Sequence, residues 1–179
     1  MVNGPDFVRD IRPDDFAEVD ALLQAAFGGV QEVALVHALR RDKDMVSESV
    51  IHWDGRIIAY AGLSRMVAPV GWLCLAPVAV LPEAQRGALT PAGQAKGHWQ
   101  VGKRLVSELA SAARTPEFDK SPAIVVLGQP EFYEQCGFSR TRAARLTSPY
   151  PRDFTMLAAP GEDVPKAELI YPAAFSSDD

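Results

Sequence analysis

An apolar run over residues 72–81, WLCLAPVAVL, constrains the fold more than any other stretch of the chain. Side chains on both faces of this extended segment are apolar, so we expect a central strand that is covered on both sides. Pro77 stands inside the run, and proline cannot donate a hydrogen bond to a neighbouring strand. We therefore predict a bulge, or a place where neighbouring strands part and leave backbone N–H and C=O groups free for a ligand.

The residues before this strand predict two helices and a hairpin. Apolar residues at helical spacing predict a helix that begins near Pro13 and ends at Gly28-Gly29, and a second helix over residues 31–41. Asp54-Gly55 then separates two β-rich runs, which is a strong hairpin signal. The run 72–81 is thus the third of three consecutive strands.

The residues after it predict a mixed α/β arrangement. Residues 101–114 form an amphipathic pattern, and the strand expected over 123–128 runs parallel to 72–81 because a helix connects them. A brief helix over 130–136 follows, and short strand-like pieces extend to about Tyr171. We predict one α/β (α+β) domain over residues 1–179, with disordered tails at 1–6 and 176–179.

Composition limits the partners and the compartment. The chain has 23 acidic and 18 basic side chains and a net charge of −5, which argues against a general nucleic-acid binder. No apolar run reaches the length of a membrane span and no signal peptide is recognisable, so we expect a cytoplasmic protein without membrane contact. Cys74 and Cys136 are the only cysteines, and neither they nor the three histidines show metal-ligand spacing. We expect reduced thiols and no metal.

The segment between the central strand and the next helix has the features of an anion-binding site. Gln85-Arg86-Gly87 follows the strand, and Val101-Gly102 opens the helix. A glycine-bearing turn before a helix N-terminus offers converging N–H donors and a positive dipole.

The order and spacing of these motifs resemble the GNAT superfamily of N-acetyltransferases that use acetyl-coenzyme A. The residues that carry the resemblance are 75–80, 85–87, 101–105 and 127–138. The last of these, LGQPEFYEQCGF, is similar to a segment of a bacterial branch of predicted N-acetyltransferases. The resemblance spans roughly residues 8 to 175. It implies the GNAT fold, a central mixed, mostly antiparallel twisted sheet that is flanked by helices and splayed between its fourth and fifth strands.

The resemblance also implies acetyl-coenzyme A as co-substrate and direct transfer of its acetyl group to an amine. The pantetheine arm is expected to pair with the splayed strand, whose backbone N–H could also polarise the thioester carbonyl. The pyrophosphate is expected at the two ends of the glycine-bearing turn. The implied cofactor-binding residues are Val78, Ala79, Val80, Gln85, Arg86, Gly87, Gln100, Val101, Gly102, Lys103 and Tyr133.

Two side chains, Tyr133 and Glu32, are candidates for the chemistry itself, whereas His37 and Cys74 are not. The resemblance implies that Tyr133 is the general acid for the departing thiolate; the alternative is a core aromatic residue whose hydroxyl bonds to backbone. Glu32 is a candidate for amine binding or base catalysis, against a solvated carboxylate on a helix face. His37 is expected to be a partly buried structural histidine. Cys74 lies in an apolar strand and is not expected to be a nucleophile.

One departure from the family pattern leaves the function open. The fingerprint [QR]-x-x-G-x-[GA] places its ends five positions apart, whereas Arg86 and Gly102 are sixteen apart. If residues 88–99 bulge outward, Lys96 adds positive charge near the cofactor, and the protein acetylates a small-molecule or peptide amine. Its assembly is then open between a monomer and a homodimer. If they fill the site, the protein is a catalytically impaired ligand-sensing or interaction module. A third alternative is a toxin-type acetyltransferase of aminoacyl-tRNA. The acidic pI weighs against it, although a local basic cluster exists at Arg140, Arg142, Arg145 and Arg152.

Overall fold

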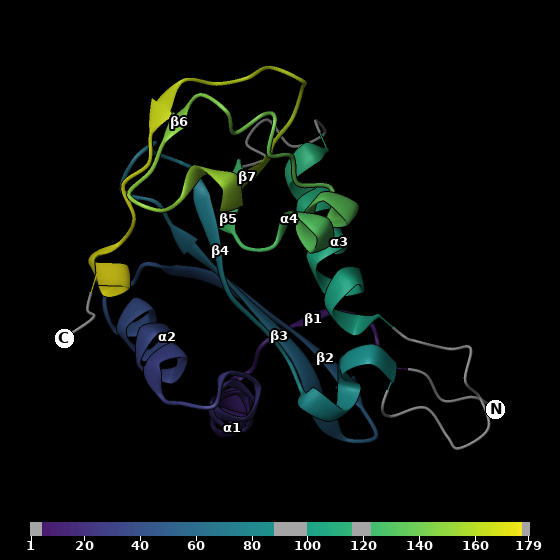
Figure 1. The fold of residues 1–179 in the computed structure, drawn as a ribbon. Helices are drawn as coiled ribbons and strands as arrows, with labels where there is room; N and C mark the ends of the chain where they lie inside the picture. Colours follow the sequence, from purple (N-terminus) through teal and green to yellow (C-terminus); the bar gives the residue numbers. More distant parts are fainter. Residues whose placement is uncertain (1–4, 88–99, 116–122, 177–179) are drawn as a thin grey trace.

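A six-stranded mixed sheet forms the centre of the molecule (Figure 1). The computed structural model describes residues 5–87, 100–115 and 123–176. The sheet order is β1-β2-β3-β4-β5-β7, and all neighbours are antiparallel except β4 and β5. The six strands are β1 (Arg9–Asp10), β2 (Met45–Trp53), β3 (Arg56–Arg65), β4 (Leu73–Val80), β5 (Ile124–Leu127) and β7 (Thr155–Ala158). The predicted mixed, mostly antiparallel sheet is confirmed.

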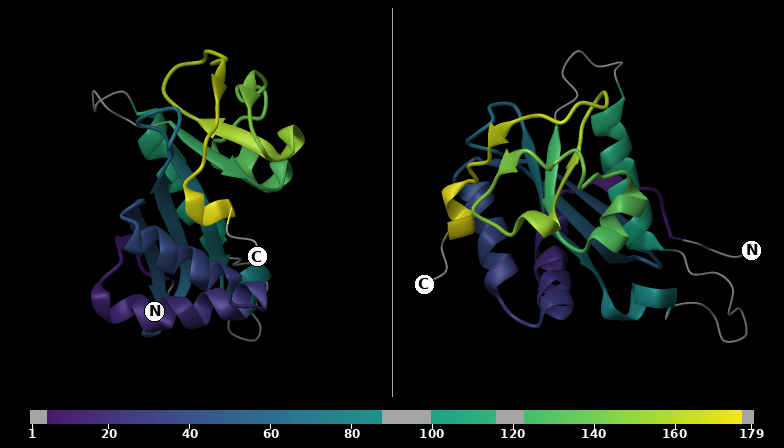
Figure 2. Two further views of the ribbon diagram at one scale, coloured as in Figure 1. Left: turned by 90° about the vertical axis from the view of Figure 1, so that its left-hand side faces the viewer. Right: turned by 45° about the horizontal axis from the view of Figure 1, so that its top comes forward.

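Helices cover both faces of this sheet (Figures 1 and 2). On one face lie α1 (Phe16–Phe27), which follows a 3-10 turn at Pro13–Asp15, and α2 (Gln31–Arg41). The other face carries α3 (Val101–Arg114), and the short α4 (Pro130–Tyr133) with its 3-10 extension Glu134–Cys136 packs against α3. Gly28 ends α1 with φ of 77°, a left-handed conformation that favours glycine.

The remaining elements are short. A separate two-stranded parallel sheet pairs β6 (Leu146–Thr147) with β8 (Ala167–Glu168). Further 3-10 helices span Pro82–Gly87, Arg152–Phe154 and Ala173–Ser176. None of the helices in the described segments has the length and apolar character that crossing a bilayer requires.

The predicted hairpin and the predicted irregularity of the central strand are both present. Asp54-Gly55 joins β2 to β3, with positive φ at both residues. Along β3 the register changes between Ala61 and Leu63, so Gly62 faces two residues of β4, Ala76 and Pro77. This is a bulge at the proline, because one extra residue of β4 stands opposite β3.

The strands β4 and β5 also part at this point. Their register pairs begin at Leu73 and end at Leu75, which pairs with Val126, whereas β4 continues to Val80. In the described part of the chain β4 therefore has a partner on only one side beyond Leu75. This confirms the splay between the fourth and fifth strands.

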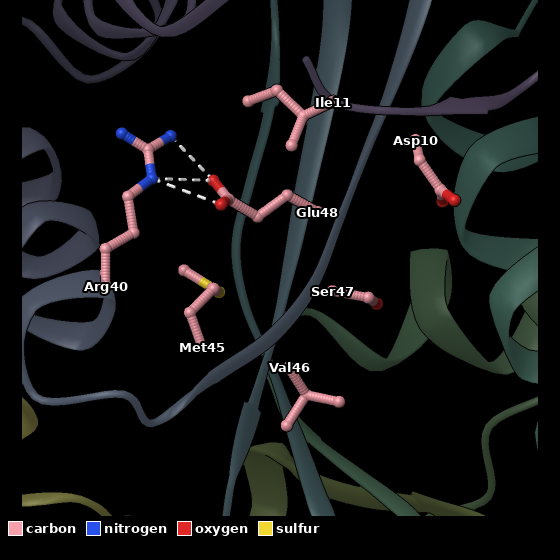
Figure 3. Close-up of a pocket in the computed structure, with 7 residues that line it drawn as sticks. All are labelled: Asp10, Ile11, Arg40, Met45, Val46, Ser47 and Glu48. Atoms are coloured by element: carbon pink, nitrogen blue, oxygen red, sulfur yellow. Dashed lines mark hydrogen bonds and ion pairs between the residues drawn. The ribbon is translucent and has the colours of Figure 1, made fainter. Parts of the chain in front are cut away.

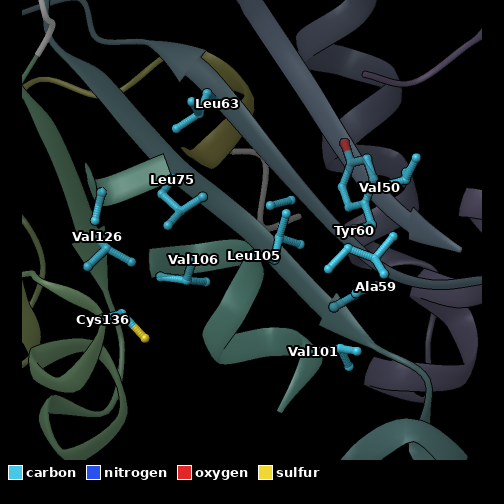
Figure 4. Close-up of a cluster of buried hydrophobic side chains, with 14 of the residues drawn as sticks. Val50, Ala59, Tyr60, Leu63, Leu75, Val101, Leu105, Val106, Val126 and Cys136 are labelled. Atoms are coloured by element: carbon cyan, nitrogen blue, oxygen red, sulfur yellow. The ribbon is translucent and has the colours of Figure 1, made fainter. Parts of the chain in front are cut away.

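The main core packs α3 against the sheet. Leu105 and Val106 of α3 lie beside Ala59 and Leu75 of the central strands (Figure 4). Asp6 belongs to the tail that was expected to be disordered, and its backbone N–H donates to the His52 carbonyl at 2.8 Å. Residues 1–4 and 177–179 lie outside the described residues.

Candidate functional site

The free edge of β4 presents backbone groups to the gap left by β5. Leu81 N donates to Ile58 O of β3 at 2.9 Å, and in an antiparallel pair such bonded positions alternate with unbonded ones. The N–H and C=O groups of Val80 and Val78 consequently point away from β3, toward the gap. The side-chain amide of Gln85 donates to Val80 O at 3.0 Å, which agrees with this direction.

A cavity of about 640 Å³ lies between this edge, the N-terminus of α3 and α4. The residues of the predicted cofactor site that line it are Val78, Val80, Gln85, Gln100, Val101, Gly102, Lys103 and Tyr133. Phe132 and Gln135 line it as well, and the sequence analysis missed them. Their proximity to Tyr133 on one short helix was the available signal.

One predicted residue, Ala79, is placed differently. Ala79 lies between Val78 and Val80 and is 2% exposed. It pairs with Tyr60 of β3, on the side of β4 that is turned away from the gap. Arg86 and Gly87 end the 3-10 helix that follows β4. The extra segment 88–99, with Lys96, lies outside the described residues.

The first turn of α3 is suited to an anion. Gln100 precedes the helix with φ of 45° and ψ of 46°, its side chain does not cap the helix, and the first turn carries no acidic residue. The N–H groups of the first helical residues therefore have no acceptor within the helix. A Cβ on Gly102 would lie 3.1 Å from Val80 Cγ2, so glycine allows α3 to approach β4 closely. Lys103 Nζ, 3.4 Å from Gln135 Oε1, adds a positive charge at the same mouth.

Tyr133 holds its phenol in a neutral state. Its ring meets Phe132 and Phe138 edge to face, at centroid distances of 5.0 and 5.9 Å. Burial raises the pKa of Tyr133 to about 12, and the nearby Cys136 and Cys74 add to the shift. The described residues give its hydroxyl no hydrogen-bond partner, so the backbone bond of the alternative interpretation is not made. A protonated phenol at the wall of a cavity can donate a proton.

The other single candidates lie apart from this cavity. Glu32 is half-buried in the first turn of α2. His37 is 53% exposed at its side chain and lies 2.8 Å from Asp20, so the prediction of partial burial was wrong, because this helix face is turned to solvent. Burial raises the pKa of Cys74 to about 12, which keeps it a thiol. Among the described residues no group of three or more His, Cys, Asp or Glu could hold a metal ion.

A second polar cluster, on the face that carries α2, was not predicted. Glu48 of β2 is 7% exposed at its side chain, and Arg40 of α2 binds both of its oxygens, with the shortest distance 2.7 Å from Nη2 to Oε1 (Figure 3). The Tyr60 hydroxyl donates to the same Oε1 at 2.7 Å. Burial, followed by the charge of Glu48, raises the pKa of Tyr60 above its ordinary range. We call Arg40, Glu48 and Tyr60 the Glu48 cluster.

Comparison with solved structures connects this geometry to known proteins. The GNAT family N-acetyltransferase YhbS from Escherichia coli, in complex with CoA, is 25% identical with a TM-score of 0.70, over 97% of this chain and 93% of that one. A GNAT family acetyltransferase from Brucella melitensis, in complex with acetyl-CoA, is 26% identical with a TM-score of 0.67, over 97% and 99% of the two chains. The chain belongs to the GNAT superfamily.

A more distant GNAT protein shares the fold. The putative acetyltransferase from Desulfovibrio desulfuricans is 18% identical with a TM-score of 0.55, over 94% of this chain and 97% of that one. No protein-family model matches the sequence, and no curated protein matches it either. Its GNAT membership thus rests on the similarity of the whole three-dimensional fold to solved GNAT structures.

Proposed function

We propose that this GNAT protein is an N-acetyltransferase that transfers the acetyl group of acetyl-coenzyme A directly to an amine. One observation carries the proposal: the parted edge of β4, the uncapped N-terminus of α3 and the neutral Tyr133 face one cavity of about 640 Å³. The two similar GNAT structures described above hold CoA and acetyl-CoA. The co-substrate supplies an activated acyl group. The chain supplies the site that binds the co-substrate and the Tyr133 proton for the leaving thiolate.

The two ends of the cavity fit different parts of the co-substrate. At one end, the N–H and C=O groups of Val78 and Val80 face the gap and are suited to pair with the amides of a pantetheine arm, as an added strand would. At the other end, the first turn of α3 with Lys103 suits a pyrophosphate. Gln85 and Gln100 line the cavity between these ends, and Arg86 and Gly87 complete the binding segment in this proposal.

Tyr133 serves as the general acid in this proposal. Its raised pKa keeps the proton on the phenol at neutral pH, where the sulfur of the leaving thiolate requires it. We place the activity in the cytoplasm, on a small-molecule or peptide amine, in a protein that works as a single domain and is able to form a homodimer.

The alternatives differ in what they require of these residues. An impaired interaction module needs no acid at position 133 and no accessible cavity. A tRNA-directed enzyme needs free cations, yet Arg142 of the local basic cluster donates to the carbonyls of Ala159, Pro160 and Asp163 and is 15% exposed at its side chain. Arg140, Arg145 and Arg152 remain exposed. The net charge of −5 is therefore what favours the amine acetyltransferase over a tRNA-directed enzyme.

The test is thermal unfolding with and without acetyl-coenzyme A. A ligand at a hundred times its dissociation constant stabilises the folded state by about 2.7 kcal/mol, which raises the melting temperature measurably. Release of free thiol in the presence of an amine panel then measures turnover. Absence of a shift at millimolar acetyl-coenzyme A would favour the interaction module, and a salt-sensitive shift with tRNA would favour the third alternative.

A further inference from the structure

The Glu48 cluster stands in one row with the bulge of the central strand. Glu48 pairs directly with Gly62 of β3, and Gly62 faces Ala76 and Pro77 of β4. A Cβ on Gly62 would lie 3.1 Å from the Tyr60 hydroxyl and 3.3 Å from the Ala76 carbonyl oxygen. Because Gly62 has no side chain, the Tyr60 hydroxyl and the Ala76 carbonyl oxygen both approach the position that a Cβ would occupy.

A cavity of about 390 Å³ gives access to this row from the sheet edge (Figure 3). Glu48 and Arg40 line it on the face of α2, and Asp10 of β1 is an exposed carboxylate at its rim. The apolar part of the lining comes from Ile11 and Met45. The Met45 methyl group lies 3.3 Å from the same Gly62 point, so this side chain contacts both the cavity and the space above Gly62.

A buried hydroxyl without a partner among the described residues lies on the same face. Ser64 is 0% exposed, pairs across the strands with Met45 on one side and Cys74 on the other, and its Oγ has no partner among the described residues. The Tyr171 ring packs on the cluster that includes Cys74 and Ala76. Buried polar groups without partners are uncommon in proteins, so a polar ligand is expected to approach the Ser64 hydroxyl.

The charges of the lining select a cation. The Arg40 guanidinium is occupied by Glu48 and stacks on the Phe16 ring at 4.0 Å, so its charge is already balanced. Asp10 then leaves the lining with a net negative charge. On Glu48, Oε1 accepts three hydrogen bonds, whereas Oε2 accepts one at 3.1 Å and has a free lone pair.

We propose that this cavity is the acceptor subsite of the GNAT protein and takes a primary ammonium group on an unbranched aliphatic chain. The ammonium binds Glu48 Oε2 beside the Gly62 row, and the methylene groups lie against Ile11 and Met45. For reaction, the ammonium passes one proton to Glu48 Oε2 and its neutral nitrogen forms the bond to the acetyl carbon. The carbon–sulfur bond then breaks, Tyr133 protonates the thiolate, and the second proton of the nitrogen leaves to solvent. The sheet then separates two ligands, with the co-substrate on the α3 face and the acceptor on the α2 face, and they meet at the bulge of β4. The acetylation of the bound amine rests on the proposed function, whereas the binding of the amine to this cavity does not.

The experiment titrates the protein, loaded with coenzyme A, with 1-aminopentane and follows backbone amide shifts by NMR. Shifts are expected at residues 46–48 and at Gly62, and much weaker ones with the uncharged 1-pentanol or the branched tert-butylamine. Shifts confined to other regions, or none with 1-aminopentane, overturn the proposal. A repeat with the unloaded protein separates failure of acetyl-coenzyme A binding from failure of the acceptor subsite.

Variants test the role of the carboxylate. Glu48→Gln should weaken 1-aminopentane binding by about tenfold or more, because a hydrogen bond to a charged group is lost, while the acetyl-coenzyme A melting shift is retained. Ser47→Arg brings a cation to the lining without touching the buried pair, and it should weaken the amine equally if Glu48→Gln does not fold. The exposed Glu108→Gln is the matched control and should bind as the unmodified chain does. Equal amine binding by Ser47→Arg and the control overturns the proposal.

Discussion

The ring of Tyr133 covers Gly128 so closely that no side chain fits between them: a Cβ on Gly128 would overlap the ring and stand 2.8 Å from Tyr133 Cδ2. We expect Gly128→Ala to push the ring from its position at the cavity, and turnover should fall together with the melting temperature. Overpacking of this kind costs about 1–3 kcal/mol. Gly29→Ala is the control, because nothing lies within 4 Å of its Cβ position. Equal turnover of the two variants would argue against a positioned ring.

Tyr133→Phe separates the proton from the packing. The ring stays in place and only the hydroxyl is lost, so we expect the melting shift with acetyl-coenzyme A to persist while kcat falls by about 10²–10⁴-fold. The measurement is steady-state thiol release on the accepted amine. A variant with unchanged kcat would refute the acid role.

The pH dependence follows from the raised pKa of Tyr133. An acid works in its protonated form, and a pKa of about 12 moves loss of that proton well above the ordinary value for tyrosine of 10.0. We therefore expect Tyr133 to produce no alkaline loss of kcat up to about pH 10. If an alkaline limb below that pH disappears in Tyr133→Phe, burial does not protect the phenol as described.

Gly102→Ala tests the approach of α3 to the central strand. The new methyl group would stand 3.1 Å from Val80 Cγ2, so the valine must move toward the cavity by a few tenths of an ångström. The gain in helix propensity, about 1 kcal/mol, opposes the crowding, and we expect little net change in melting temperature. Affinity for acetyl-coenzyme A should fall instead, as measured by calorimetry. Ser111→Ala, on the exposed part of the same helix, should leave affinity unaltered.

The sequence predicts the parts of the site that depend on local chain geometry. Pro77 in a central strand is enough to expect the bulge and the parted edge, because the missing donor acts at its own position. Glu48 is different. Its partners lie eight and twelve residues away on α2 and β3, and its place beside the bulge depends on strand register and on the bare Gly62. A glutamate within a β-rich run was the only local signal. His37 shows the reverse error, since apolar neighbours in sequence do not set which helix face is buried.

Asp15 gives the fold an acid-sensitive contact. Its carboxylate accepts two hydrogen bonds from Arg9, at 2.8 and 3.0 Å, and one from the Arg12 backbone at 2.7 Å. The Arg9 side chain, with help from Arg12 and against partial burial, lowers the pKa of Asp15 from 3.8 to about 2. A group whose pKa is lowered by folding stabilises the folded state above its unfolded pKa, and that contribution is lost as pH falls from about 4 to about 2.

We therefore expect Asp15→Asn to reduce the free energy of unfolding by about 1 kcal/mol at pH 7 and by much less near pH 2.5. Urea unfolding at both pH values measures the difference. Asp42→Asn is the control, because Asp42 also pairs with an arginine, Arg41, but lies exposed on the surface, where such pairs contribute little. A deficit in Asp15→Asn that is equally large at both pH values would mean that the substitution disturbs packing at the start of α1, and that the ionised carboxylate contributes nothing to stability.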